Sequence, residues 1–299
     1  MKQMTGIVQP MVTPLTGHDT IDVAGLERLI EHILAGGVHG VFVLGTTGEA
    51  PSLSYRLRRE LIERVCRQVR GRAPVLVGIT DTAFVESVAL ARHAAEAGAD
   101  AVVAAPPYYW PEGQLELREY FAHLVAELSL PLFLYNMPAL TKVVIAPETI
   151  RHAMYNPRII GIKDSGGDMA YFDELLKLAR EREDWRVFVG PEHLTAEAVC
   201  RGGHGGVNGG ANLLPRLFVE LYEAARRGDV ARVAGLQARV ERLGQIYRVG
   251  QYASSVIKGL KCALSLLGIC DDFMAEPFHR FREAERQQVR QLLAEMKLL

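Results

Sequence analysis

Between residues 6 and 208 the chain repeats one pattern eight times. Each repeat is a short apolar run followed by a longer segment with apolar residues at helical spacing. The runs are continuously apolar rather than alternating, which is typical of parallel strands buried on both faces. The predicted strands are 6–12, 40–44, 74–79, 100–105, 131–135, 158–163, 186–190 and 205–208.

The helical segments complete the pattern and set the expected fold class. They are 22–36, 54–70, 82–97, 113–128, 147–154, 168–182, 192–201 and about 213–226. Eight strand–helix units suit closure into an α/β (β/α)8 TIM barrel. A doubly wound open sheet is the alternative, and no G-x-G-x-x-G follows the first strand to support its dinucleotide-binding form. Three more helical segments follow without a strand, so we expect a barrel over 1–227 and a C-terminal three-helix extension over 228–299.

Composition excludes several classes of function. The net charge is −1 over 299 residues, and no basic stripe with interleaved aromatic residues is present, so we expect no nucleic-acid partner. The N-terminus lacks the apolar core and cleavage site of a signal peptide, and no apolar run approaches the roughly 18 residues that a membrane span needs. The four cysteines are far apart, as in a cytoplasmic protein with reduced thiols.

One lysine lies where chemistry is expected in a barrel, at the C-terminal end of a strand. Lys163 ends an apolar run and is followed at once by Asp164 and a Ser-Gly-Gly turn. Burial disfavours a charged ammonium and makes a free amine available as a nucleophile, which can form a Schiff base with a carbonyl substrate. Only seven of the 34 basic residues are lysine, so this chain normally uses arginine for positive charge. The alternative is a surface lysine just past a strand end.

Two other strand ends carry groups that suit such a site. Gly45-Thr46-Thr47-Gly48-Glu49 follows the second predicted strand, and its hydroxyls and N–H groups suit a small carboxylate. A turn capped by threonines is the alternative. Tyr135 ends the fifth predicted strand, and its phenol could carry the protons that imine formation and carbon–carbon cleavage require. A core tyrosine with a satisfied hydroxyl is the alternative there.

Three further features allow more than one interpretation. Tyr108-Tyr109-Trp110 is either aromatic packing or an interface patch. The glycines of 202–210 either bind phosphate or permit close packing. The histidines show no H-x-x-x-H or H-E-x-x-H spacing, so a metal site has little support. A barrel enzyme that binds phosphate without covalent chemistry and a non-catalytic binding protein therefore stand beside the Schiff-base hypothesis.

Four motifs together resemble one known family. Gly45–Glu49, Pro107–Tyr109, Tyr135–Pro138 and Gly161–Asp164 occur in the order and at the separations of the dihydrodipicolinate synthase / N-acetylneuraminate lyase family of class I, pyruvate-type aldolases. The resemblance covers essentially the whole chain. It implies a lyase in which the lysine of the fourth motif forms a Schiff base with pyruvate or another 2-oxo acid. It also implies a cytoplasmic homotetramer, and we expect no metal and no cofactor.

The same resemblance implies roles for individual residues. Lys163, Tyr135, Thr47 and Tyr109 would be catalytic: Tyr135 would transfer protons, and Thr47 would link it to Tyr109, which would reach in from a neighbouring subunit. The residues expected to bind or line the substrate are Thr46, Thr47, Gly48, Gly190 and Val207.

The substrate is the least determined part of the prediction. In dihydrodipicolinate synthases an arginine two residues after the proline of the Y-N-x-P motif binds the carboxylate of the aldehyde, and here Leu140 stands there. Sialic acid lyases usually read G-S-T-G-E and have an acidic pair after Gly190, where this chain has only Glu192. We therefore expect reversible cleavage of a 2-keto-3-deoxy sugar acid, such as 2-keto-3-deoxygluconate, to pyruvate and an aldehyde. The alternatives are 4-hydroxy-tetrahydrodipicolinate synthase, which condenses pyruvate with aspartate semialdehyde, and N-acetylneuraminate lyase.

Overall fold

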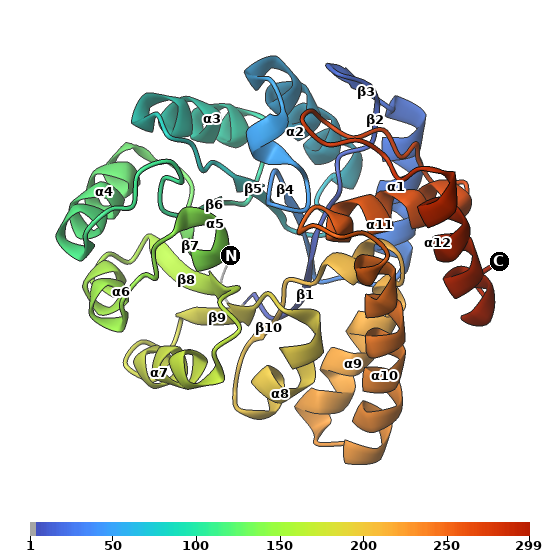
Figure 1. Ribbon diagram of the computed structural model, residues 1–299. Coiled ribbons are helices and arrows are strands. Elements are labelled where there is room, and N and C mark those ends of the chain that lie inside the picture. Colours follow the sequence, from blue (N-terminus) through green and yellow to red (C-terminus); the bar gives the residue numbers. More distant parts are fainter. Residues whose placement is uncertain (1–3) are drawn as a thin grey trace.

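The computed structural model describes residues 4–299 and shows a closed barrel of eight parallel strands ringed by helices (Figure 1). The predicted TIM barrel is confirmed, although the first three residues of the predicted range 1–227 lie outside the described residues. Each strand pairs with its neighbour in the sequence, and β1 closes the ring between β4 and β10. The strands are β1 (Gly6–Pro10), β4 (Gly40–Val43), β5 (Val75–Gly78), β6 (Ala101–Ala104), β7 (Leu132–Asn136), β8 (Ile159–Asp164), β9 (Arg186–Val189) and β10 (Gly205–Gly206).

The helices alternate with these strands and then continue alone. They are α1 (Val23–Ala35), α2 (Tyr55–Val69), α3 (Phe84–Glu96), α4 (Gln114–Glu127), α5 (Pro138–Thr141), α6 (Pro147–Met154), α7 (Met169–Ala179), α8 (Thr195–Cys200), α9 (Pro215–Arg227), α10 (Val230–Leu243), α11 (Ser255–Leu266) and α12 (Glu283–Glu295). The sequence did not predict α5 or the small hairpin of β2 (Leu15–Gly17) and β3 (Thr20–Ile21). Elements of two to four residues are too short to show a period.

Two apolar layers hold the barrel together. The inner layer fills the barrel, and its largest members include Phe42, Phe133 and Phe188, with the last two rings in edge contact at 5.9 Å between centroids. The outer layer packs the other face of each strand against the helices. The barrel interior is therefore a packed core that forms a solid floor beneath the strand ends.

Close contacts explain several of the glycines of 202–210, and Gly205 is the clearest case. Gly205 has φ +153°, and a Cβ at this position would lie 1.9 Å from the carbonyl oxygen of Gly6 on β1. The Nδ1 of His204 accepts a hydrogen bond from the backbone N–H of Val187 at 3.0 Å. These contacts favour the close-packing interpretation of the segment over the phosphate site.

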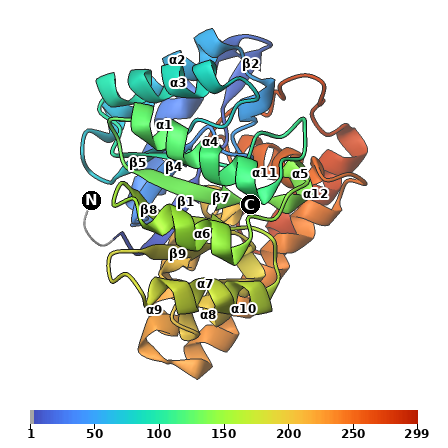
Figure 2. The same cartoon turned by 90° about the vertical axis from the view of Figure 1, so that its left-hand side faces the viewer.

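Two of the helices beyond the barrel, α11 and α12, lie at the same end as the strand C-termini. Helix α9 ends at Arg227, Gly228 follows in the left-handed conformation, and α10 packs along α9. Figure 2 shows α11 and α12 at the end where α5 follows β7. Asp22 joins this segment to the barrel because one carboxylate oxygen accepts from Gly25 N and the other from Asp271 N, both at 2.8 Å. In residues 4–299 no helix has the length and apolarity to cross a membrane.

Gly205→Ala should destabilise the barrel by about 2 to 4 kcal/mol, because the new methyl group meets the Gly6 carbonyl and the backbone conformation disfavours any side chain. Urea unfolding followed by circular dichroism measures the change. Gly235→Ala is the matched control: this exposed helical glycine has nothing within 4 Å of a new Cβ, so stability should rise by up to about 1 kcal/mol. Equal losses in both variants would contradict the packing account.

Candidate active site

Lys163 and Tyr135 lie side by side because β7 and β8 pair in a register that places them opposite each other. Both side chains are buried, with 8% of Lys163 and 6% of Tyr135 exposed. The Nζ of Lys163 lies 4.0 Å from the centroid of the Tyr135 ring and 5.5 Å from that of Phe42. The amine therefore lies against two aromatic rings at the C-terminal end of the barrel, the end at which we expected Lys163.

A small cavity of about 20 Å³ borders the amine inside the barrel. Its lining is apolar except for Lys163 and includes Phe42, Phe133 and Val207. A cavity of this size holds at most one water, and a water needs two or more polar partners. The inner side of the amine is thus nearly dry, and a ligand would approach from the mouth.

The Gly45–Glu49 turn has the shape of an anion cradle. Non-glycine residues adopt left-handed conformations at both of its ends, with φ 58° at Leu44 and 56° at Glu49. Among residues 4–299, no acceptor is hydrogen-bonded to the backbone N–H of Thr46 or Thr47, and both side chains are partly exposed. Successive free N–H groups beside hydroxyls form a concave site for a carboxylate.

Thr46, rather than Thr47, contacts the phenol. Thr46 Oγ1 and Tyr135 OH lie 3.2 Å apart, within hydrogen-bonding distance. Thr47 instead faces the other side of the mouth, with Oγ1 3.9 Å from where a Cβ of Gly209 would lie. The expectation that Thr47 links Tyr135 onward therefore needs correction, because consecutive side chains of this turn point in different directions.

The environment of Tyr135 favours its ionised form. Burial alone raises the pKa of the phenol, but the positive charge of Lys163 and hydrogen bonds with Thr46, Ser165 and Lys163 together outweigh it. The net effect is a lowered pKa for Tyr135. A phenol with a lowered pKa is better placed to exchange protons near neutral pH.

Ser165 is a site residue that the sequence reasoning missed. Its Oγ would lie 2.0 Å from a Cβ on Gly190, so the serine occupies the space that glycine leaves open. Gly190 is fixed in turn by a 2.6 Å hydrogen bond from its N–H to the Asp164 carbonyl. The only signal in the sequence was that Ser165 follows the Lys-Asp pair directly.

The other two residues predicted to line the site, Val207 and Gly48, lie at different depths in the barrel. Val207 belongs to the inner layer of the barrel and borders the cavity beside Lys163. Gly48 is buried behind the turn: its carbonyl accepts from Thr13 Oγ1 at 2.7 Å, and a Cβ would lie 3.0 Å from the Met11 carbonyl. Gly48 therefore shapes the turn, while its two threonines face the mouth.

A hydrogen bond between Asn136 and Asp164 joins the C-terminal ends of β7 and β8. Asn136 Nδ2 donates to Asp164 Oδ1 at 2.7 Å, and Asn136 Oδ1 accepts from Ile145 N at 3.1 Å. Asp164 also accepts from Gly166 N at 3.1 Å. Burial raises the pKa of the Asp164 carboxyl despite these bonds. The pair keeps the residues before it, Tyr135 and Lys163, at fixed positions.

Glu192, the single acid after Gly190, is bonded to the protein. Its Oε2 accepts from Gly210 N at 2.9 Å, and burial raises the pKa of its carboxyl to about 7. Because this carboxylate already accepts a hydrogen bond from the protein, it has fewer acceptor positions left to bind the hydroxyl groups of a sugar.

Tyr109 lies outside the site of its own chain. It is 67% exposed, packs edge-on against Trp110 at 5.5 Å between centroids, and its carbonyl accepts from Lys142 Nζ at 3.1 Å. Its expected role in the site of a neighbouring subunit stays a prediction.

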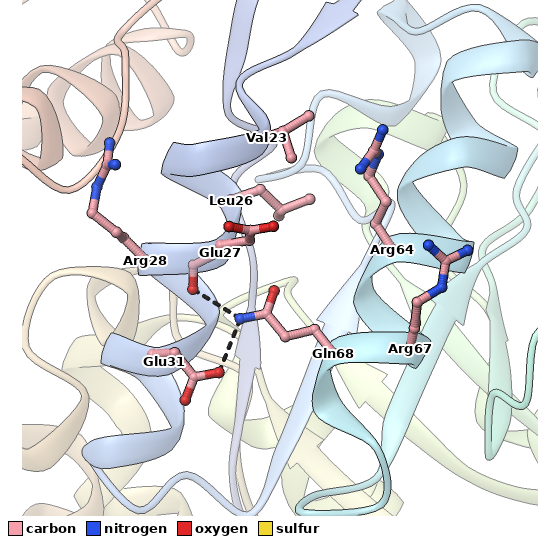
Figure 3. Close-up of a pocket in the computed structure, with 8 residues that line it drawn as sticks. All are labelled: Val23, Leu26, Glu27, Arg28, Glu31, Arg64, Arg67 and Gln68. Carbon is pink, nitrogen blue, oxygen red and sulfur yellow. Dashed lines mark hydrogen bonds between the residues drawn. The ribbon is translucent and has the colours of Figure 1, made fainter.

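A wider groove of about 640 Å³ lies elsewhere, between α1 and α2 on the outside of the barrel (Figure 3). Both signs of charge line it, including Glu27, Arg64 and Arg67. Gln68 spans it, donating to the Glu27 carbonyl and to Glu31 Oε1, both at 2.9 Å. None of the strand-end residues of the mouth takes part in this groove.

The fold and the mouth define a (β/α)8 lyase with a lysine, a tyrosine and an anion cradle at the strand ends. Residues 3–296 match the model of the dihydrodipicolinate synthetase family, and the chain belongs to this family. Among residues 4–299 no group of three or more His, Cys, Asp or Glu is placed to hold a metal ion.

Relatives with different assigned substrates are similar to the chain. It is 34% identical over 260 residues, 86% of each chain, to the probable 2-dehydro-3-deoxy-D-pentonate aldolase YjhH of Escherichia coli K12. It is 30% identical over 97% of its length, and 98% of the relative, to the 4-hydroxy-tetrahydrodipicolinate synthase of Methanospirillum hungatei. Among solved structures, a dihydrodipicolinate synthase from Bacteroides thetaiotaomicron is 54% identical with TM-score 0.96, covering 99% of both chains. YagE of Escherichia coli K12, solved with pyruvate, is 30% identical with TM-score 0.93 over the same coverage.

Lys163→Met should raise the pKa of Tyr135, because the effect of burial remains after the positive charge is removed. Ultraviolet difference titration of this variant, with and without Tyr135→Phe, isolates the one phenol. Thr46→Val should also raise the pKa of Tyr135, whereas Thr47→Val should leave it unchanged. A response to Thr47→Val but not to Thr46→Val would contradict the assigned contact.

Proposed function

We propose that this lyase forms a Schiff base between Lys163 and a 2-oxo acid, and that its substrate is a 2-keto-3-deoxy sugar acid such as 2-keto-3-deoxygluconate. The observation that carries the proposal is the amine of Lys163, which lies 4.0 Å from the ring of Tyr135 at the open end of the barrel. The free N–H groups of Thr46 and Thr47 lie on the same mouth and suit the carboxylate of the 2-oxo acid.

The reaction follows from these groups. Lys163 passes its proton to the Tyr135 phenolate, and the resulting free amine attacks the C2 carbonyl. Tyr135 then protonates the departing oxygen, so that water leaves as the iminium forms and Tyr135 is again a phenolate. The phenolate removes the proton of the C4 hydroxyl, the C3–C4 bond breaks, the aldehyde leaves, and the electron pair moves to the iminium as an enamine. Tyr135 gives this proton to C3, and water hydrolyses the resulting iminium to pyruvate and the protonated amine. Thr46, 3.2 Å from Tyr135, orients the phenol for these proton transfers.

The presence of Leu140 favours a substrate whose aldehyde product carries no charge. It lies in α5 at the mouth end and is 47% exposed, where a synthase would have its carboxylate-binding arginine. An arginine–carboxylate pair is bidentate and strong, so its absence disfavours an aldehyde that carries a carboxylate. The similarity to relatives named as 2-dehydro-3-deoxy sugar acid aldolases points the same way.

A synthase is the second candidate. The Bacteroides thetaiotaomicron structure at 54% identity carries the name dihydrodipicolinate synthase, and this identity is higher than the 34% and 31% of the two relatives named as 2-dehydro-3-deoxy sugar acid aldolases. In that case pyruvate would form the same adduct and condense with aspartate semialdehyde. The two candidates share Lys163 and differ in what the mouth accepts.

We further propose a homotetramer in which a neighbouring subunit covers an exposed apolar face. Tyr109, Trp110, Leu140 and Val144 are each 47 to 75% exposed. Lys142 Nζ bonds the Tyr109 carbonyl, and Gln114 Nε2 bonds the Val144 carbonyl at 2.9 Å, so these residues share one face. Covering it would bring Tyr109 toward the Thr46–Tyr135 pair of the partner.

Pyruvate with borohydride should add one reduced pyruvate to the protein, because the reagent reduces the iminium to a stable amine. Intact-protein mass spectrometry detects the adduct, and peptide mapping should locate it on Lys163. Lys163→Ala should abolish it, while Lys177→Ala, on an exposed lysine of α7, should not. An adduct that persists in Lys163→Ala would refute the proposal.

The parent protein should cleave 2-keto-3-deoxygluconate faster than sialic acid and should be slow with aspartate semialdehyde plus pyruvate. Leu140→Arg should improve the use of aspartate semialdehyde by about tenfold or more, since it supplies a charged partner for the carboxylate. Comparison of kcat/KM values over the three substrates checks this. A parent enzyme that prefers aspartate semialdehyde would establish the second candidate instead.

A further inference from the structure

A buried ion pair holds the Gly45–Glu49 turn from outside the barrel. Lys261 Nζ donates to Glu49 Oε1 at 2.6 Å, and both side chains are fully buried. Glu49 Oε2 accepts a second bond, from Ala275 N at 2.9 Å. Lys261 lies on α11 and Ala275 in the segment after it, so both carboxylate oxygens are bound by the C-terminal extension.

The conformation of the turn shows why it needs outside contacts. Left-handed conformations at Leu44 and Glu49 are unfavourable for residues with side chains, and they persist where the surroundings enforce them. At the first end, β5 approaches so closely that a Cβ on Gly78 would lie 2.1 Å from the Leu44 carbonyl oxygen. At the second end the enforcing contacts are the two bonds to Glu49.

The pair is connected to the cradle by direct bonds. Glu49 N donates to the Thr46 carbonyl at 3.1 Å, and the Thr46 hydroxyl contacts Tyr135. Helix α11 also reaches the other side of the mouth, where Leu260 lies 3.5 Å from a Cβ position on Gly209, which itself faces Thr47. A shift of Glu49 would therefore move the N–H groups proposed to hold the carboxylate.

Stability alone does not account for two charges at this place. Taking both ions out of water is costly, and apolar side chains of similar volume are often as stabilising as a buried pair. A bidentate anchor fixes orientation in a way that apolar contacts do not. We propose that Lys261 is a positioning residue: acting through Glu49, it sets the geometry of the carboxylate cradle, so the C-terminal extension takes part in binding the 2-oxo acid. This inference rests on the proposed function.

The test compares Lys261→Met and the double variant Glu49→Gln/Lys261→Met with the parent protein. The pyruvate concentration for half-maximal borohydride trapping should rise about tenfold or more in both, because the cradle loses charge-assisted bonds that orient it. At saturating pyruvate the adduct should still form at Lys163. Arg286→Met is the matched control: it removes another cation of the extension, paired at 2.5 Å with the buried Asp272, and should leave half-saturation unchanged.

If Lys261→Met does not fold, the double variant still decides the question, because it removes both charges and leaves no buried carboxylate without a partner. Parent-like half-saturation in a folded double variant, or failure of the double variant to fold, would overturn the positioning role. Pyruvate titration by calorimetry gives the same comparison without the borohydride reduction. Absence of any adduct in the parent protein would instead count against the proposed function, and the calorimetric comparison would still decide the role of Lys261.

Discussion

The proposed chemistry depends on the contact between the Lys163 amine and the Tyr135 ring at the end of two paired strands. A flexible lysine can hold one position only where its stem is packed, and here Phe42 and the apolar cavity lining supply that packing. Strand register fixes the pair laterally, and the Asn136–Asp164 bond fixes the next residue of each strand. The packed barrel interior supports these side chains rigidly, and the groups at the strand ends are those proposed to react.

The Gly45–Glu49 turn faces the amine across the mouth, and its conformation depends on contacts from other segments. Its two left-handed residues require contacts from β5 and from the buried Glu49–Lys261 pair. The C-terminal segment thus does more than follow the barrel, since its Lys261 ammonium and Ala275 N–H bind the carboxylate of Glu49 at the end of this turn. The boundary at residue 228 between the barrel and this extension stays a prediction. The bonds of the extension to Asp22 and Glu49 show that it is joined closely to the barrel.

Local pattern was enough to predict the barrel. Continuous apolar runs gave all eight strands, with ends differing from the structure by at most two residues, and the strand-end rule selected Lys163 and Tyr135. Contacts that join distant segments could not be predicted. Lys261 meets Glu49 across 212 residues, and nothing in the sequence analysis singled it out. The direction of side chains within a tight turn was equally hard to predict, so the contact with Tyr135 was expected from Thr47, whereas Thr46 makes it.

We propose that one amine, one phenol and one turn act on the same 2-oxo acid. A crystal structure of the protein trapped with pyruvate and borohydride would show whether they do. We expect continuous density from Lys163 Nζ to C2 of the ligand, with the carboxylate within hydrogen-bonding distance of the Thr46 and Thr47 N–H groups and the Tyr135 hydroxyl near the reacting carbons. Density on another side chain, or a carboxylate bound away from the Gly45–Glu49 turn, would contradict it.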